Sequence, residues 1–453
     1  MNILYIHTHD SGRILSPYGY DVPTPNMKKF ASDATIFTEG YCVSPTCSPS
    51  RAALLTSTYP HQNGMLGLAQ RGFSIDYSKH LVNYLKGNGF QTVLCGIQHE
   101  AGWYLDHEAG AEMIGYNENL TCDNSGYRQE DLTIWDQKNA GILEDWINKY
   151  DNEKPFFISY GMYATHRRYP DVIDEDINEN MVNPPAPLPN NKETRKDHAG
   201  YLTSAKSADI CFEKIIQSLK DNGLYENTII IFTTDHGLAN PFSKCTLFDN
   251  GIGVSLIVRV PNSKSNGQVV DNLVSHVDVF PTLCDLLNLE KPEYLEGKSF
   301  AKSFEDVDAP TRDAVFAEVS FHTSYEPIRC VRTERYKYIR YYDATYLKVN
   351  RSNIDESLSK DYLLKNDLDK QVKYEEALYD LYYDTGERNN LINNPRYEEV
   401  RIDLSNKLEK HLKDTGDIIL NGEIPISKDW KVNKKECMQA SSKDKNDYVS
   451  LGK

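Results

Sequence analysis

The sequence Cys47-Ser48-Pro49-Ser50-Arg51, followed by Ala52-Ala53-Leu54-Leu55-Thr56, predicts a helix over about residues 49–57. Pro49 suits the first turn of a helix, where its missing N–H would have no partner in any case, and the alanines and leucines propagate the helix. Cys47 is therefore predicted to lie just before the helix N-terminus. Unpaired backbone N–H groups and the positive end of the helix dipole favour an oxyanion at that place. Arg51, one turn further on, adds a positive charge that can contact the anion and orient the cysteine side chain.

Apolar runs typical of strands alternate with helical stretches along the first half of the chain. Strands are predicted at 2–8, 91–95, 155–161 and 228–233, and helices at about 26–33, 49–57, 77–87, 138–149 and 196–221. This alternation favours an α/β domain whose mostly parallel central sheet is covered by helices on both faces. Ligands of such sheets gather at the C-terminal ends of the strands. Polar residues that follow a strand are therefore candidates for a functional site.

Polar residues follow three of these predicted strands. Asp10 comes after the first strand, His166 after the third, and Asp235 and His236 after the fourth. A carboxylate or an imidazole at a strand end can bind a metal or act in catalysis, but the same residues are common in turns and strand caps. A lone cysteine such as Cys47 is likewise more often a buried core residue. Taken one at a time, these residues leave a functional and a structural interpretation open.

The length of 453 residues, with 40% hydrophobic and 26% charged residues, is sufficient for one large globular domain and a smaller one. The sequence contains no run of about 18 apolar residues, so we expect no membrane span and no membrane partner. The N-terminus has neither a basic region nor a small-residue cleavage site. Nine scattered cysteines fit a reducing compartment. We therefore expect a cytoplasmic protein, unless a leader has been removed.

The motif from Cys47 to Arg51 resembles the signature of the type I sulfatases, whose cysteine is oxidised after synthesis to formylglycine by a maturase. The turn Tyr59-Pro60-His61-Gln62-Asn63-Gly64-Met65 is similar to one in the sulfamidase branch, the N-sulfoglucosamine sulfohydrolases. Resemblances continue in order and with compatible spacing over roughly residues 2–390. They include Gly96-Ile97-Gln98-His99, Thr165-His166-Arg167, Thr234-Asp235-His236-Gly237 and the segment from Lys244 to Phe248. Five motifs in register make a chance match very improbable.

The resemblance implies a role for each of these residues. Sulfate ester cleavage needs a nucleophile in line with the leaving oxygen, cations on the sulfate oxygens and a proton for the leaving group. Arg51 and Lys244 would hold the anion, and His99 and His166 are candidates for base and acid. The implied catalytic residues are thus Cys47, Arg51, His99, His166 and Lys244. The implied substrate-binding residues are Arg167 and His61, and the implied metal ligands are Asp10, Asp235, His236, His9 and Cys47.

Two positions depart from the family pattern. His9 stands where the family usually has the first of two aspartates, and Ile97 stands where most members have a lysine that touches the sulfate. Calcium is the usual family metal and is held by hard oxygens, so we expect Ca²⁺. Two imidazoles in place of oxygen ligands would shift the preference towards Mn²⁺ or Zn²⁺. The missing lysine leaves the substrate class more open than the reaction class.

The resemblance implies an alkaline-phosphatase-like sulfatase fold, with a large mostly parallel sheet flanked by helices and a smaller C-terminal α+β subdomain. We expect a catalytic domain at 1–311, the C-terminal subdomain at 312–425 and a polar tail at 426–453. The formal net charge of −16 disfavours nucleic acid as a partner and also disfavours a highly sulfated polymer. A small sulfated substrate is easier to reconcile with this charge.

The leading hypothesis is a formylglycine-dependent sulfatase that acts on a sulfated sugar, with an N-sulfated glucosamine unit as the sharpest expectation. One alternative is a phosphonate monoester or phosphodiester hydrolase, because relatives with this fold and a formylglycine cleave phosphorus esters. A further alternative, from another functional class, is a non-catalytic protein that binds sulfated glycans and whose Cys47 is never modified. The complete maturation motif argues against a mere binding protein.

Overall fold

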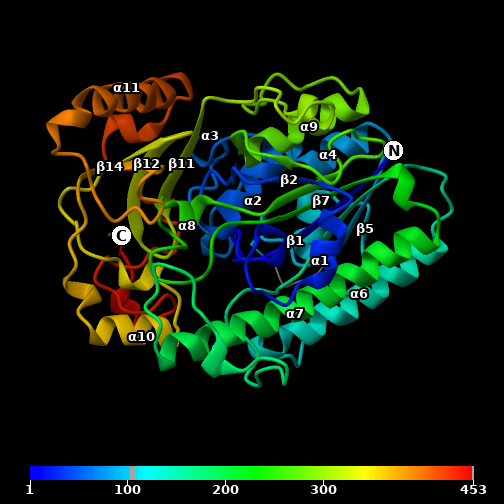
Figure 1. Cartoon of the computed structure of the whole chain (residues 1–453), viewed down its shortest axis with the longest axis horizontal. Helices are drawn as coiled ribbons and strands as arrows, with labels where there is room; N and C mark the ends of the chain where they lie inside the picture. The colour runs from blue at the N-terminus through cyan, green and yellow to red at the C-terminus, as the bar shows by residue number, and fades with distance from the viewer. Residues whose placement is uncertain (103–107, 451–453) are drawn as a thin grey trace.

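A large sheet of eight strands forms the centre of the molecule in the computed structural model, which describes residues 1–102 and 108–450 (Figure 1). In spatial order the strands are β5 (Glu118–Asn119), β4 (Gln91–Gly96), β6 (Phe156–Gly161), β1 (Asn2–Thr8), β7 (Thr228–Thr234), β8 (Leu256–Arg259), β2 (Thr35–Phe37) and β9 (Val269–Val270). In this spatial order, the first five strands, from β5 through β4, β6 and β1 to β7, pair in parallel. Strand β8 is antiparallel to both β7 and β2. The predicted mostly parallel sheet is confirmed.

Strands β1, β6 and β7 are buried along their whole length, which explains their near-continuous apolar sequences. In the register, His7 on β1 lies beside Gly161 on β6 and Thr233 on β7. The three strands therefore end at one edge of the sheet. The residues that follow them, including His9 and Asp235, are brought together there.

Helices cover both faces of this sheet. One face, with Leu4, Ile158 and Ile230, packs against α1 (Pro25–Ala31), α6 (Leu132–Lys149) and α7 (Lys192–Asp221), and the last two run side by side along the lower edge of Figure 1. The other face packs against α2 (Cys47–Thr56), α4 (Leu81–Gly87) and α9 (Val279–Leu287). Short elements complete this part: β3 (Gly40–Tyr41), α3 (Pro60–Asn63), α5 (Ala109–Ile114), α8 (Asp249–Ile252) and β10 (Val274–Ser275).

The C-terminal part is built on a second, antiparallel sheet. Its strands are β11 (Ala314–Phe321), β12 (Tyr325–Thr333), β13 (Tyr336–Tyr341) and β14 (Glu376–Asp380), and it is accompanied by α10 (Leu358–Lys365) and α11 (Glu398–Asp414). Leu404, Leu408 and Leu412 of α11 pack on this sheet. The chain after α11 returns to the N-terminal part, where the ring of Trp430 stacks on that of Phe73 at 4.3 Å between centroids. The smaller C-terminal α+β part is thus present as expected.

Several predicted element boundaries are corrected by tertiary contacts. The helix expected at 49–57 begins at Cys47, because Thr46 adopts the extended backbone of an N-cap residue. The helix expected at 138–149 begins at Leu132, because Trp135 is buried in the first turns. The stretch 77–87 is broken at His80, whose ring accepts a hydrogen bond from Val82 N and caps a separate helix, α4.

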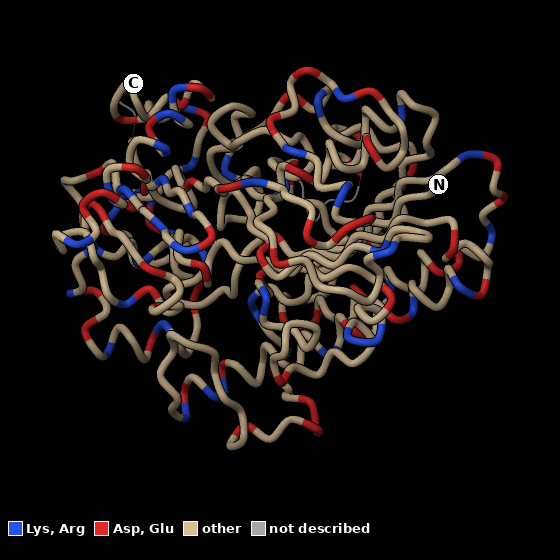
Figure 2. The backbone as a smooth tube through the Cα atoms, turned by 45° about the horizontal axis from the view of Figure 1, so that its top comes forward, with Lys and Arg blue, Asp and Glu red and all other residues tan. Residues whose placement is uncertain are grey.

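Charged residues lie mainly on outer loops and helices, whereas the central strands are nearly free of them (Figure 2). In the parts of the chain that the structure describes, no helix has the length and apolarity needed to cross a bilayer.

Candidate active site

The core of the site lies where β1 and β7 end. Asp10 donates its backbone N–H to the Oδ1 of Asp235 over 2.9 Å, so the two strand ends are tied directly to each other. Asp10 has a φ of +47°, in the left-handed region that side-chain-bearing residues seldom adopt. Both carboxylates are buried, at 0% and 3% exposure. Their close approach places two negative charges in the interior and requires compensation.

Four potential ligand groups meet at this point: His9, Asp10, Cys47 and Asp235 each offer an atom, and these atoms all lie within 4.8 Å of one another. His236 adds a fifth group, because its Nε2 lies 3.2 Å from Asp10 Oδ1 and 3.4 Å from Cys47 Sγ. The other ring nitrogen of His236 donates to the carbonyl oxygen of Gly237 over 2.9 Å. This hydrogen bond leaves the Nε2 lone pair directed at the cluster, as in metal-ligating histidines.

The buried polar atoms of the cluster fit a divalent cation. The Nδ1 of His9 lies 3.1 Å from Asp235 Oδ2, and Asp10 Oδ1 lies 3.2 Å from His236 Nε2. The Nε2 of His9 is buried without a hydrogen-bond partner among the described residues. Buried polar groups are rarely left in this state, since each costs about 1–3 kcal/mol. A cation held by these atoms would satisfy them and would neutralise the two carboxylates. The donor set of two carboxylates and two imidazoles suits the metals considered from the sequence.

Arg51 lies beneath the cluster and orients it. Its Nη2 donates to Asp235 Oδ2 over 3.1 Å and to the carbonyl oxygen of Thr8 over 3.0 Å, and its Nη1 contacts His7 Nδ1. Burial raises the pKa of Asp235, but His236, Arg51 and His9 lower it more, so that this pKa lies well below its usual range. Arg51 therefore keeps a metal-ligand candidate ionised and fixed in place.

Cys47 occupies the first turn of α2 and is 1% exposed. Burial raises the pKa of its thiol well above the usual value, although Lys244 and Arg51 act in the opposite direction. The thiol is therefore protonated at neutral pH and is a poor nucleophile as it stands. The helix N-terminus nevertheless offers backbone N–H groups and a positive dipole beside it.

Lys244 and His166 approach Asp10 from the side away from Arg51. Lys244 donates from Nζ to Asp10 Oδ2 over 3.2 Å and to Asp355 Oδ2 over 2.9 Å. The Nε2 of His166 lies 4.0 Å from Asp10 Oδ2, and its side chain is 25% exposed. Since Lys244 is only 3% exposed, His166 is the predicted catalytic group most open to solvent. It therefore marks the mouth of the site.

His99 completes the group from the end of β4. Its Nε2 lies 2.9 Å from Gln70 Oε1, and its ring lies 5.8 Å from that of His9 between centroids. Burial and the nearby Arg51 hold the pKa of His99 well below its usual range, so the ring is neutral at pH 7. The structure thus brings together nine predicted residues: His9, Asp10, Cys47, Arg51, His99, His166, Asp235, His236 and Lys244.

Comparison with known proteins identifies this arrangement. The family model described as Sulfatase matches residues 1–289, which is more than half of the chain. The chain belongs to the sulfatase family. A second model, described as N-sulphoglucosamine sulphohydrolase, C-terminal, matches residues 235–357. Both matches agree with the resemblance that the motifs indicate.

Individual relatives and a solved structure extend these matches. The chain is 27% identical over 455 residues to an ulvan-active sulfatase of Formosa agariphila, covering 92% of this chain and 75% of the relative. It is 26% identical over 378 residues to human N-sulphoglucosamine sulphohydrolase, covering 75% of this chain and 72% of the relative. The structure of the phosphonate monoester hydrolase SpPMH from Silicibacter pomeroyi superposes with a TM-score of 0.71 at 18% identity, covering 95% of this chain and 98% of the other. The last similarity shows that the fold is shared beyond sulfatases.

The structure does not support substrate contact by Arg167. Its guanidinium forms a two-pronged ion pair with Asp197, with distances of 2.6 and 2.8 Å, and it also donates to Asn240 Oδ1 and to the carbonyl oxygen of Ala239. The side chain is 7% exposed. Arg167 is therefore occupied in fixing the loop after β6, which carries His166.

The structure also does not support substrate contact by His61. Its side chain is fully buried, and its Nδ1 contacts Glu318 Oε2 on β11 and lies 3.5 Å from Asp417 Oδ2. Its Nε2 lies 2.9 Å from Thr415 Oγ1. The motif that carries His61 therefore connects the N-terminal part to the C-terminal sheet. Sequence spacing alone does not show that the C-terminal part covers the face of the turn that carries His61.

Three residues near the site were missed by the sequence analysis. Asp355 contacts Lys244, Gln70 contacts His99, and His322 lies in the turn between β11 and β12. Burial and then Lys244 lower the pKa of His322 well below its usual range. None of the three follows a strand of the main sheet or lies in a recognised motif. The placement of the C-terminal part reveals Asp355 and His322, and the fold of the short 3₁₀ helix Ala69–Arg71 reveals Gln70.

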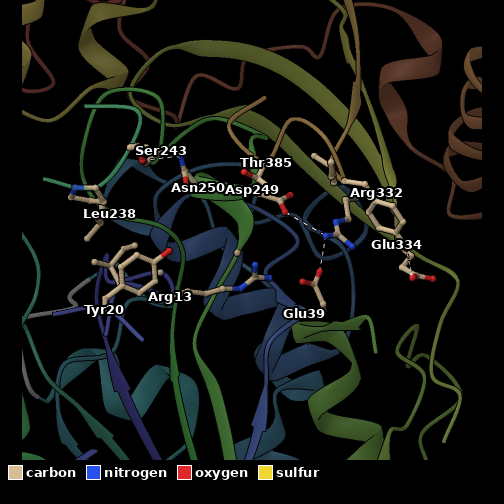
Figure 3. Close-up of a pocket in the computed structure, with 17 residues that line it drawn as sticks. Arg13, Tyr20, Glu39, Leu238, Ser243, Asp249, Asn250, Arg332, Glu334 and Thr385 are labelled. Atoms are coloured by element: carbon tan, nitrogen blue, oxygen red, sulfur yellow. Dashed lines mark hydrogen bonds and ion pairs between the residues drawn. The ribbon is translucent and has the colours of Figure 1, made fainter. Parts of the chain in front are cut away.

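A separate cavity of about 350 Å³ lies near the site between the two parts of the molecule (Figure 3). None of the predicted site residues lines it. Arg332 reaches from β12 to Glu39 over 2.6 Å and to Asp249 over 3.5 Å, and Arg13 points toward the same group (Figure 3). Arg13 and Arg332 also pack against the ring of Tyr41. This cavity is therefore walled by an internal ion-pair network that joins the C-terminal sheet to the N-terminal part.

Proposed function

We propose that this protein is a formylglycine-dependent sulfatase that releases inorganic sulfate from a small sulfated sugar. The observation that carries the proposal is the position of Cys47 in the maturation motif, at a helix N-terminus and 3.4 Å from His236 in a cluster suited to a divalent cation. A binding protein would not need this combination of a modification signal and a metal-ligand set. A formylglycine-generating maturase is the partner that this proposal requires.

The residues of the chain divide the chemical work. His9, Asp10, Asp235 and His236, with the modified residue 47, would hold the cation, for which we propose calcium. When bound, the cation would draw electron density from a sulfate oxygen and lower the pKa of an attacking hydroxyl, and hydrated formylglycine would supply that hydroxyl. Lys244 uses two of its three N–H groups on Asp10 and Asp355, so one N–H can reach a sulfate oxygen.

Proton transfer belongs to two histidines, His166 at the mouth of the site and the buried His99. His166 is partly exposed, and its Nε2 faces the cluster while its Nδ1 lies 3.1 Å from Tyr163 Oη. It is placed to protonate a leaving oxygen or nitrogen. His99 is buried and neutral, and its Nε2–H donates to Gln70 Oε1. The same N–H could donate to the leaving atom of the substrate and stabilise the departing group.

A sulfated sugar is the substrate class that the relatives favour. One relative is named as ulvan-active and another as an N-sulphoglucosamine sulphohydrolase, and the C-terminal model of the latter matches residues 235–357. We therefore propose an N-sulfated glucosamine unit as the first substrate to test. The net charge of −16 favours a small substrate or a chain end over a densely sulfated polymer.

A phosphonate monoester hydrolase remains the second candidate because Ile97 replaces the lysine that most family members have at this position. Ile97 is buried at 1% exposure and packs with Trp135 and Tyr163, so no cation enters the site from this position. The anion clamp therefore differs from the usual sulfatase pattern. The fold alone does not decide between the two reactions, since a phosphonate monoester hydrolase shares it.

Turnover of three substrates would test the proposal. Protein co-produced with a formylglycine-generating enzyme, with the aldehyde at position 47 verified by mass spectrometry, is assayed on an aryl sulfate, an aryl phosphonate ester and N-sulfoglucosamine. We expect sulfate release that is absent from Cys47→Ala and greatest for the sugar. Preferred hydrolysis of the phosphonate would establish the second candidate, and no turnover by aldehyde-bearing protein would refute both.

A further inference from the structure

Asp355, in the C-terminal segment before α10, forms an ion pair with Lys244. Its Oδ2 accepts a hydrogen bond from Lys244 Nζ over 2.9 Å, and the same Nζ also donates to Asp10 Oδ2 over 3.2 Å. The side chain of Asp355 is 17% exposed, compared with 3% for Lys244 and 25% for His166. Asp355 and His166 are therefore the two partly open groups that border the lysine. A molecule whose sulfate contacts Lys244 can place its remaining atoms near them.

The backbone around Asp355 is held by an unusually dense set of hydrogen bonds. Asn353 Oδ1 accepts from the backbone N–H groups of Thr323 and Ser324 over 3.1 and 3.0 Å. Lys360 Nζ donates to the carbonyl oxygen of Ile354 over 2.8 Å. These contacts fix the two residues that precede Asp355 before any ligand arrives. A preorganised carboxylate loses little freedom on binding and can discriminate between ligands.

A second anchor ties the same segment to the loop that carries His166. The hydroxyl of Ser359, in the first turn of α10, donates to Asp197 Oδ2, and Asp197 in turn pairs with Arg167. The positions of Asp355 and His166 are therefore coupled through Asp197. The segment before α10 and the loop after β6 are thus joined at one border of the site.

Asp355 carries a full negative charge at neutral pH. Burial raises its pKa, but Lys244, His166 and His322 lower it more, and the result lies well below the usual range. An ionised carboxylate accepts hydrogen bonds and donates none. Its Oδ2 accepts a hydrogen bond from Lys244, and the side chain is 17% exposed, so the carboxylate can also reach a ligand. A hydroxyl or ammonium group is attracted to such an atom, and a sulfate or carboxylate group is repelled.

We propose that Asp355 is a specificity-determining residue, which accepts a hydrogen bond from a hydroxyl or amine of the sugar beside the sulfated atom and rejects a second anionic group at that position. This inference rests on the proposed function and narrows its substrate class to sugars with one sulfate near the site. A purely structural role, in which Asp355 only holds Lys244 in place, would affect every sulfated substrate equally. The two roles therefore predict different ratios of kcat/KM between substrates when Asp355 is replaced.

The test compares two sugars and an aryl sulfate on the aldehyde-bearing protein. Glucosamine N-sulfate offers hydroxyl donors beside its sulfate, glucosamine N,3-disulfate places a second anion on the adjacent carbon, and the aryl sulfate has no hydroxyl groups. Asp355→Asn keeps an acceptor for Lys244 but removes the charge. We expect this variant to lower kcat/KM for the monosulfate about tenfold more than for the aryl sulfate, as for the loss of one charged hydrogen bond. We also expect the preference for monosulfate over disulfate to shrink by a similar factor.

Controls separate recognition from damage to the fold. Asp361→Asn alters an exposed acid in α10 and should match the parent protein on all three substrates. Asp355→Glu retains the charge and should retain rejection of the disulfate. Equal losses on all substrates in Asp355→Asn, with the monosulfate to disulfate ratio unchanged, would overturn the inference.

A binding measurement covers the case in which no substrate is turned over. The affinities of Cys47→Ala protein for the two glucosamine sulfates are measured by calorimetry, with and without Asp355→Asn. A preference for the monosulfate that disappears in the variant would support the role of Asp355 even if the proposed reaction failed. Equal preference in both proteins would refute it independently of activity.

Discussion

Replacement of Arg167 by methionine should destabilise the protein and not merely weaken substrate binding. The guanidinium donates to both oxygens of Asp197 over 2.6 and 2.8 Å, to Asn240 Oδ1 over 2.6 Å and to the carbonyl oxygen of Ala239 over 2.8 Å. Both members of the ion pair are 7% exposed. The methionine can fill most of the volume but can satisfy none of these acceptors.

The expected loss in the free energy of unfolding comes from the carboxylate of Asp197, which would stay in the interior without its partner. Asp197 would keep a hydrogen bond from Ser359 but would lose the positive charge that compensates its own. Removal of one partner of a buried ion pair costs about 3–5 kcal/mol, because the other charge is left without compensation. We therefore expect the free energy of unfolding to fall by about 4 kcal/mol, which is a large part of a typical domain's stability.

Urea unfolding followed by tryptophan fluorescence would measure this loss. Arg168→Met is the matched control, because Arg168 is 68% exposed and forms one ion pair with Glu130 over 3.2 Å. Such a surface pair is worth about 0.2–1 kcal/mol, so this variant should unfold close to the parent. An Arg167→Met protein with an unchanged unfolding midpoint and a raised KM would refute this reasoning and would restore a substrate-binding role.

Three other perturbations have defined outcomes. Dialysis against EDTA should abolish sulfate release and lower the unfolding temperature, because Asp10 and Asp235 lose their compensating cation, and Ca²⁺ should restore both; full activity in metal-free protein would contradict this. Trp135→Ala removes a fully buried ring and should cost about 3–5 kcal/mol in urea unfolding, whereas a loss below 1 kcal/mol would be inconsistent with its burial. Burial raises the pKa of Asp136 from 3.8 to about 8, so its contribution to stability is complete below pH 3.8 and is lost as the pH rises towards 8. Asp136→Asn should therefore gain stability relative to the parent over that interval, while the exposed Asp145→Asn should follow the parent at every pH.

The sheet and the position of the site could be predicted because their signals are local. The apolar strands at 2–8 and 228–233 are visible as continuous runs, and parallel strands place the residues after them at one edge. Asp10 and Asp235 are therefore adjacent in the structure, as their positions after strands indicate. The antiparallel strand β8 was not anticipated, because its four residues carry no signal that distinguishes its direction.

Arg167 and His61 show where motif reasoning is insufficient. Each lies beside a functional residue or within a family-like motif, but its partner is more than 25 residues away along the chain: Asp197 for the first and Glu318 for the second. A charged side chain next to a site can contact either a ligand or a buried counter-ion. Which of the two it contacts depends on tertiary packing that no local pattern encodes.

Asp355 and His322 extend this argument to the substrate. The groups that would handle the sulfate lie at strand ends and in α2, which the apolar runs and the helix start make visible in the sequence. The groups that we propose to border the remainder of the substrate come from the turn between β11 and β12 and from the segment before α10, which are joined by the side chain of Asn353. A change in these C-terminal segments can therefore alter which sugar is accepted without disturbing the chemistry at Cys47. Substrate choice in this protein is accordingly least predictable from motifs and most dependent on how its C-terminal part folds over the site.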